Sequence, residues 1–237
     1  MLNDVRDYAI KKRLQNISKV ILVGSGKGGV GKSTIAVALS LALKDVGYEV
    51  GLLDADIHGP TDAILLSVKG QLSGDRDGIS PYVKYGIKVM SIGAFSEGEP
   101  LVSYGKAKIG LIKDMLAYVN WGKLDYLVVD LPPGIGDEVL GITRYARGKL
   151  NGVVVTTPGI SVPVVQRFIN FLKGEGIPIS LVIINMAYIN CDGKNISLFG
   201  NEDVLFEYPS VKIPLIVGGN KINEIKNTLL SFINYVR

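Results

Sequence analysis

The segment Gly24–Thr34, GSGKGGVGKST, has the residue types and the spacing of a phosphate-binding loop, or P-loop. Its glycines let backbone N–H groups approach phosphate oxygens closely, and the helix that follows directs the positive end of its dipole at the same anion. Lys32 is placed to reach the β- and γ-phosphates, and the Ser33 hydroxyl to bind Mg²⁺. We therefore predict that this loop binds a nucleotide through Gly26, Lys27, Gly28, Gly29, Val30, Gly31, Lys32, Ser33 and Thr34.

Three aspartates follow apolar runs typical of strands, namely Asp54, Asp56 and Asp130. Carboxylates at strand ends can serve a Mg²⁺-bound nucleotide. We expect Asp56 to position the attacking water, which makes it catalytic together with Lys27 and Lys32. Asp54 is expected to orient the metal's water shell, and Asp130 to hold Mg²⁺ through water. Helix capping remains the alternative for Asp54 and Asp56.

The base specificity is predicted from the end of a late strand, Ile183-Ile184-Asn185. Guanine-specific P-loop proteins usually carry Asn-Lys-x-Asp there, and this chain does not. We expect Asn185 to hydrogen-bond the adenine edge and Pro214, with its neighbours, to pack on the face of the base. The sequence therefore favours ATP over GTP.

The elements that must position these residues alternate along the chain. Apolar strand patterns occur at 19–23, 49–53, 87–92, 125–130, 152–156, 179–184 and 213–217, and helical patterns at 32–46, 106–119, 137–147, 161–173 and 221–236. This alternation predicts an α/β fold with a mostly parallel central sheet covered by helices on both faces. Such sheets bind ligands beyond the carboxyl ends of their strands, which is where the motifs lie.

The domain organisation is predicted to be simple: one P-loop domain over 1–237, with 1–17 as an N-terminal helical extension. Within the extension, residues 3–15 form an amphipathic helix through Val5, Ala9 and Leu14, which we expect to pack on the outside of the sheet.

The composition excludes several other classes of protein. The chain has 237 residues, 47% of them hydrophobic, and a formal net charge of +4, which suit a globular domain. No basic block interleaved with aromatic residues appears, so specific nucleic-acid binding is not expected. The N-terminus is too charged for a secretory signal and no apolar run reaches membrane-spanning length, so we predict a cytoplasmic protein.

Five segments together resemble the Mrp/ApbC-type ATPases, which are iron-sulfur cluster carriers of the SIMIBI class of P-loop NTPases, related to MinD and ParA. They are GSGKGGVGKST, DADIHGP, WGKLDYLVVDLPPGIGDE, VVVTTPG and INMAYINCDG. The resemblance implies a homodimer that encloses two ATP molecules, hydrolyses them slowly and delivers clusters to apo-protein clients. It also implies that Lys27 is the class's additional lysine, which crosses the dimer interface, and that Asp56 and Asp130 are its hydrolytic and Walker B aspartates.

One departure from this family concerns the iron-sulfur cluster. Members typically carry Cys-x-x-Cys after the adenine strand, so that two subunits supply four thiolates to one [4Fe-4S] cluster. Here the loop reads Cys191-Asp192-Gly193-Lys194, and a protonated lysine cannot bind iron. Two alternatives stay open: Cys191 as a ligand of a cluster with two thiolates, or a relative that has lost the cluster.

The rival functions are a MinD/ParA-like positioning or regulatory ATPase without a cluster, and an adaptor that dimerises with ATP but does not hydrolyse it. MinD-like proteins end in a basic amphipathic helix that binds membranes. The last helical pattern here carries an apolar stripe but only three basic residues, Lys221, Lys226 and Arg237. We therefore expect this segment to pack on the core instead of binding a membrane.

Overall fold

The computed structural model describes residues 5–56, 59–91, 105–159, 162–191, 193–197 and 207–236. Parts of some predicted elements, at residues 3–4, 92 and 161, lie outside the described residues, as does Asp192 of the cysteine loop.

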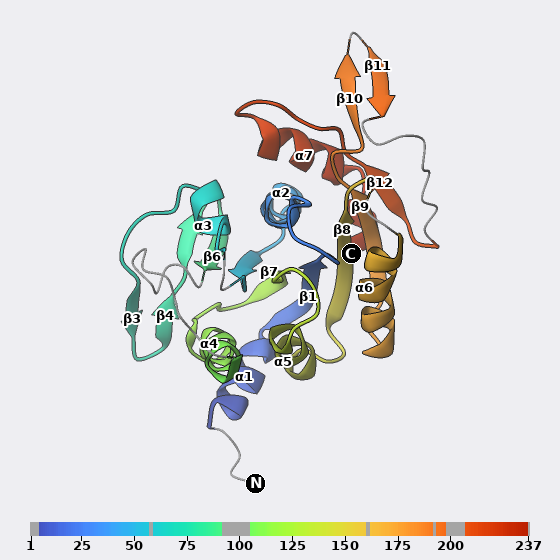
Figure 1. Cartoon of the computed structure of the whole chain (residues 1–237). Coiled ribbons are helices and arrows are strands. Elements are labelled where there is room, and N and C mark those ends of the chain that lie inside the picture. Colours follow the sequence, from blue (N-terminus) through green and yellow to red (C-terminus); the bar gives the residue numbers. More distant parts are fainter. Residues whose placement is uncertain are drawn as a thin grey trace.

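The centre of the molecule is an eight-stranded sheet with the order β12-β9-β8-β1-β7-β2-β6-β5 (Figure 1). Within this sheet only β5 runs antiparallel to its neighbour. The strands are β1 Ile17–Gly24, β2 Val50–Asp54, β5 Tyr82–Lys84, β6 Ile87–Ser91, β7 Leu124–Asp130, β8 Leu150–Thr156, β9 Ile179–Ile184 and β12 Ser210–Lys212. Their apolar runs are buried because helices cover both faces of the sheet. The predicted fold class is thus confirmed.

Helices form a layer on each face of the sheet. Figure 1 shows α1, α4 and α5 together on one face and α2 with α7 on the other, while α6 packs on β8 and β9. The helices are α1 Val5–Gln15, α2 Lys32–Asp45, α3 Asp62–Leu65, α4 Gly105–Tyr118, α5 Asp137–Tyr145, α6 Val162–Gly174, α7 Lys221–Leu230 and α8 Ile233–Val236. The helix α2 is apolar on nearly all sides and lies against the sheet, which fixes the position of the P-loop that precedes it.

Two hairpins that the sequence patterns did not indicate stand outside the central sheet. They are β3 Ser73–Asp75 with β4 Gly78–Ser80, and β10 Tyr188–Cys191 with β11 Lys194–Ser197. Figure 1 shows the second hairpin extending well beyond the body of the molecule. Their strands are short and largely exposed, so they lack the apolar runs on which the strand predictions depended.

The predicted strand over 213–217 is wrong. The last strand of the sheet is β12, Ser210–Lys212, which pairs with β9. Pro214 has no N–H to donate to a ladder, and the N–H of Leu215 bonds to the carbonyl of Tyr188, in β10. The apolar residues here are therefore part of a connection that follows the edge of the sheet.

Two helix predictions need correction. In α1 Leu14 is buried and Ala9 packs against the core, as predicted. The side chain of Val5, however, is 84% exposed, and Ile10, which was not predicted, is completely buried. The predicted helix over 221–236 is two helices, α7 and α8, separated at residues 231–232.

The apolar stripe of the C-terminal helices is buried in the core. Ile225, Leu229, Ile233 and Val236 are all nearly inaccessible to solvent, as expected for a segment that packs on the domain. None of the helices in the described part of the chain combines the length and the apolar character that crossing a membrane requires.

Candidate functional site

The predicted carboxylates meet because three neighbouring strands end at the same edge of the sheet. Asp130 at the end of β7 is the register partner of Asp54 at the end of β2, and Asp54 is in turn the partner of Ser91 in β6. Side chains at partnered positions of parallel strands point to the same face. Residues far apart in sequence therefore form one polar cluster beside the P-loop, which follows β1.

A cavity of about 280 Å³ lies at this edge of the sheet. It brings together most of the residues predicted to bind nucleotide and the predicted water-positioning residue Asp56. Gly26, Asp54, Asp130, Asn185 and Pro214 are not among its lining residues, which are Ser25, Lys27, Gly28, Gly29, Val30, Gly31, Lys32, Ser33, Thr34, Asp56, Thr61, Leu65 and Pro133.

The backbone of the P-loop leaves no room for a side chain at Gly26 or at Gly31. Gly31 has φ of 83°, in the left-handed region, and a Cβ there would lie 2.3 Å from the Asn185 side-chain nitrogen. At Gly26 a Cβ would lie 2.5 Å from the carbonyl oxygen of Val164. Gly31 is the N-cap of α2 and makes no side-chain capping bond. The first N–H groups of this helix, whose residues line the cavity, are therefore available as donors for an anion.

Lys32 forms a buried ion pair at the base of the cavity. Its Nζ donates to Asp130 Oδ1 over 2.7 Å, and both side chains are almost completely buried. Burial raises the pKa of Asp130, and the positive charge of Lys32 and the Ser33 hydroxyl oppose that rise. The predicted Mg²⁺-binding residues, Ser33 and Asp130, thus lie close to the predicted phosphate-binding lysine.

Asp54 and Asp56 have different surroundings although one residue separates them. The Asp54 carboxylate is buried and accepts hydrogen bonds from the backbone N–H groups of Asp56 and Asp62 and from the Ser91 hydroxyl. Burial, together with the negative charge of Asp130, raises the pKa of Asp54 to about 7. Asp56 is only half-buried, lines the cavity and accepts a bond from the N–H of Gly59. Asp56 is therefore the one of the two that a ligand in the cavity could touch.

The raised pKa of Asp54 predicts how the stability of the metal-free, nucleotide-free protein depends on pH. Between about pH 4 and about pH 7 the folded chain holds a proton that the unfolded chain has released, so the free energy of unfolding falls as the pH rises through this range. Urea unfolding in the presence of a chelator measures this slope. We expect Asp54→Asn to make it shallower and the exposed Asp77→Asn to leave it unchanged. Stability that rises over the same range in the wild type would contradict the burial argument.

Asn185 lies behind the P-loop. It is 4% exposed, and its side-chain nitrogen donates to the carbonyl of Val30 over 2.9 Å. The amide therefore supports the shape of the loop. Pro214 is half-buried in the connection after β12. Contact of either residue with adenine stays a prediction.

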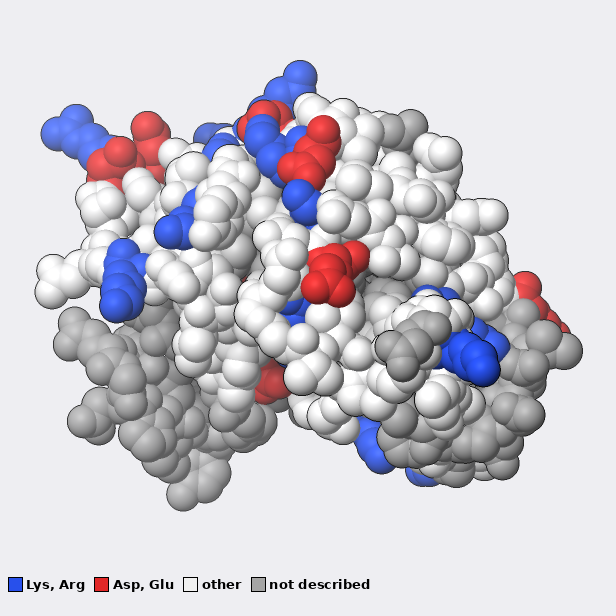
Figure 2. Space-filling view, turned by 90° about the horizontal axis from the view of Figure 1, so that it is seen from above, with Lys and Arg blue, Asp and Glu red and all other residues white. Residues whose placement is uncertain are grey.

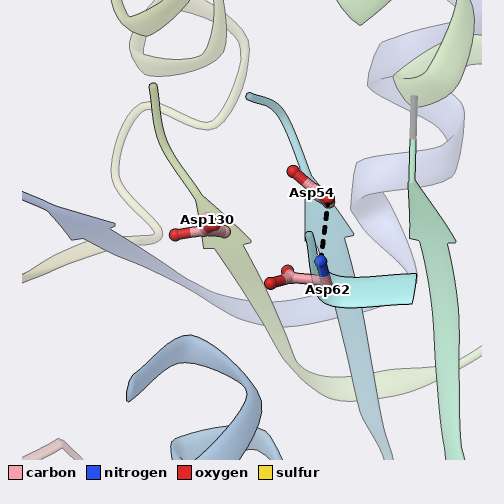
Figure 3. Close-up of side chains that lie close together, drawn as sticks. All are labelled: Asp54, Asp62 and Asp130. Carbon is pink, nitrogen blue, oxygen red and sulfur yellow. Dashed lines mark hydrogen bonds between the residues drawn. The ribbon is translucent and has the colours of Figure 1, made fainter. Parts of the chain in front are cut away.

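Asp62, Ser91 and Thr61 belong to this site although the sequence analysis did not single them out. Asp62 begins α3 and is completely buried, and neither of its carboxylate oxygens has a hydrogen-bond partner among the described residues. Figure 3 shows its carboxylate extending toward Asp130, while its backbone N–H bonds to Asp54. The available signal was an acidic residue shortly after Asp54 and Asp56, directly before the apolar residues Ala63 to Leu65.

Lys27 and Cys191 are both exposed, Lys27 at the P-loop and Cys191 on the β10–β11 hairpin. Lys27 lies in the lining of the cavity. Cys191 lies near the turn of the β10–β11 hairpin, where its register partner is Lys194. Lys194, which stands where the ATPases that the sequence resembles typically carry a second cysteine, is therefore directly opposite Cys191.

The charged side chains on the face viewed in Figure 2 are of both signs. Acidic groups lie beside basic ones, and no extended area of basic side chains is visible among the described residues on this face.

Comparisons with known proteins agree on one family. A family model described as "ParA: NUBPL iron-transfer P-loop NTPase" matches residues 16–218. Proteins named iron-sulfur cluster carrier protein from Saccharolobus solfataricus and Methanocaldococcus jannaschii are 41% and 42% identical, over 82% of this chain and 68% and 70% of their own lengths. A protein of the same name from Aquifex aeolicus is 42% identical, and the chain spans only 55% of it.

Solved structures show the same architecture. A nucleotide-binding protein from Archaeoglobus fulgidus, solved with ADP, has a TM-score of 0.79 and 33% identity, and the match covers 96% of this chain and 93% of the other. The cell division ATPase MinD from Pyrococcus furiosus has a TM-score of 0.64 at 21% identity, covering 93% of this chain and all of MinD. The second likeness supports the fold alone.

Proposed function

The chain belongs to the ParA/NUBPL family of iron-transfer P-loop NTPases, and from this premise we propose that it binds and hydrolyses Mg-ATP as a homodimer that carries iron-sulfur clusters. The observation that carries the ATPase part of the proposal is the cavity at the P-loop, in which the start of α2, two lysines and Asp56 converge. We also propose that 1–237 is a single domain, with 1–17 as an extension whose helix packs on α4.

The residues of the cavity fit a nucleoside triphosphate. The uncapped first turn of α2 offers N–H groups, and Lys27 and Lys32 add positive charge at the same place. In this proposal Lys32 binds the β- and γ-phosphates, the Ser33 hydroxyl holds Mg²⁺, and Asp130 and Asp54 hold its water shell. Oδ2 of Asp130 is buried and has no hydrogen-bond partner among the described residues, and it is an oxygen of the kind that Mg²⁺ prefers. When bound, Mg²⁺ neutralises phosphate charge.

Asp56 is the proposed water-positioning residue. Its carboxylate lies in the cavity lining and is partly open to solvent, whereas those of Asp54 and Asp130 are fully buried. A carboxylate in this position can orient a water beside the terminal phosphate. Its role is catalytic only if the nucleotide's phosphates lie along the P-loop.

Lys27 is the proposed contact between subunits. Its side chain is exposed at the edge of the cavity, so it is accessible to a second copy of the chain. We propose that each Lys27 binds the nucleotide of the other subunit, and that ATP thereby changes the geometry of the dimer.

In this proposal the iron-sulfur cluster is cargo that the protein transfers. The cysteine content of the chain does not suit a cluster held by four cysteines. The sequence contains one cysteine, so a homodimer supplies two thiolates. Their exposure on a projecting hairpin suits transfer to a client protein. The missing thiolates also favour a second candidate function, that of a MinD/ParA-like regulatory ATPase without a cluster.

Anaerobic reconstitution with iron and sulfide separates these two candidates. For the carrier we expect visible charge-transfer absorption and about one cluster per dimer, both lost in Cys191→Ser, while the variant keeps its ATP affinity. Lys194→Ala is the matched control because it changes the facing residue without removing a thiolate. A wild-type protein that binds ATP but takes up no cluster would support the second candidate instead.

A further inference from the structure

The buried carboxylates beside the P-loop form a group with more acceptors than donors. One ligand oxygen from each of Asp54, Asp62 and Asp130 lies within 4.8 Å of the others, and all three side chains are completely buried. Asp54 accepts three hydrogen bonds and Asp130 Oδ1 accepts one from Lys32. Both oxygens of Asp62 and Oδ2 of Asp130 have no hydrogen-bond partner among the described residues.

Unpartnered carboxylate oxygens are costly in a protein interior. A buried polar group without a partner destabilises the folded protein, and the effect is larger when the group is charged. If all three carboxylates are ionised, Lys32 balances only one of their charges, and two negative charges remain. A divalent cation supplies the missing charge.

A single proton does not satisfy the same atoms. A proton on one Asp62 oxygen could bond to Asp130 Oδ2, but the other Asp62 oxygen would still have no partner. A hard divalent cation, in contrast, is coordinated by oxygens from several carboxylates at once. In octahedral coordination at about 2.1 Å, ligand oxygens lie about 3 to 4 Å apart, so the spacing here needs little adjustment. Figure 3 shows the Asp62 carboxylate directed into the group, toward Asp130.

We propose that Asp62, Asp130 and Asp54 form a binding site for a divalent cation of the Mg²⁺ or Mn²⁺ type that fills without nucleotide. Asp62 supplies the unpartnered oxygens that define the site, Asp130 contributes Oδ2, and Asp54 orders the backbone of Asp62 through its hydrogen bond. The site shares Asp130 and Asp54 with the Mg²⁺ position proposed for the nucleotide, and it differs in two respects: it includes Asp62, which has no role in the nucleotide proposal, and it fills when no nucleotide is bound. The inference does not depend on the proposed ATPase activity.

The test is a titration of Mn²⁺ into metal-stripped, nucleotide-free protein near neutral pH. Electron paramagnetic resonance measures binding as the loss of the signal from free Mn²⁺. We expect wild type to bind one equivalent that Mg²⁺ displaces. Asp62→Asn should weaken binding at least tenfold, since an amide brings no charge and a weaker ligand. The control Asp77→Asn changes an exposed aspartate outside the group and should bind as wild type. Equal binding by Asp62→Asn, or no binding by wild type, would overturn the proposal.

Thermal unfolding tests whether the Asp62 variants lose Mn²⁺ binding only because they are unfolded. Without metal, Asp62→Asn and Asp62→Leu should melt at or above the wild-type temperature, because each removes a buried carboxyl group whose two oxygens have no hydrogen-bond partner among the described residues. Added Mg²⁺ should raise the melting temperature of wild type and leave both variants unchanged. An equal Mg²⁺-induced rise in the variants would contradict the site. ATP binding is measured on the same samples, and wild type that binds Mn²⁺ but not ATP would support this site while contradicting the proposed function.

Discussion

Replacing Lys32 with alanine is expected to lower ATP affinity on the order of 100-fold, because two charge-assisted hydrogen bonds to phosphate are lost. Isothermal titration calorimetry measures this effect directly. Lys27→Ala is the matched control: it removes another lysine of the same loop whose side chain is exposed. We expect that variant to bind ATP as a monomer and to lose ATP-dependent dimerisation in analytical ultracentrifugation. Unchanged ATP affinity in Lys32→Ala would refute the phosphate-binding assignment.

The buried pair with Asp130 gives the Lys32 variant a second expected effect. Removing one partner of a buried ion pair costs about 3 to 5 kcal/mol when the other charge stays unpaired, and the Asp130 side chain is 0% exposed. The free energy of unfolding should therefore fall in Lys32→Ala and recover in the double variant Lys32→Ala, Asp130→Asn. ATP affinity, measured without metal, should stay low in the double variant. Recovery of affinity together with stability would mean that the single variant failed through misfolding.

Replacing Asp56 with alanine is expected to slow single-turnover phosphate release by roughly 100- to 10,000-fold, the range of a positioned acid or base. ATP affinity and stability should change little, because Asp56 is half-buried and lines the cavity outside the Lys32–Asp130 pair. Asp77→Ala, at an exposed aspartate, is the control and should release phosphate at the wild-type rate.

Two outcomes of this experiment would change the assignment. Unaltered release in Asp56→Ala would transfer the water-positioning role to another residue of the cavity. Absence of release in wild type that binds ATP would favour the adaptor that uses ATP only to dimerise.

The sequence by itself determined the fold class and the centre of the site. An apolar strand, a glycine-rich turn and a helix are local features, since each is recognised from the residue pattern of a few adjacent positions. The left-handed conformation of Gly31 is likewise one that glycine adopts readily. The alternation of strands and helices then indicates a parallel sheet, and a parallel sheet brings strand ends to one edge. Asp54 and Asp130, each predicted at the end of a strand, are register partners at this edge.

Only the tertiary structure decided which groups contact one another at this edge. Lys32 and Asp130 are 98 positions apart, and Asn185 bonds to Val30 across 155 positions. The periodicity of apolar residues in the sequence does not predict such long-range side-chain contacts. Asp62 belongs to none of the sequence motifs, and only the fold encloses it among two other carboxylates. The predicted strand over 213–217 failed for a related reason: burial produces the same apolar pattern in a strand and in a connection, and the backbone partners of Leu215 decide between them.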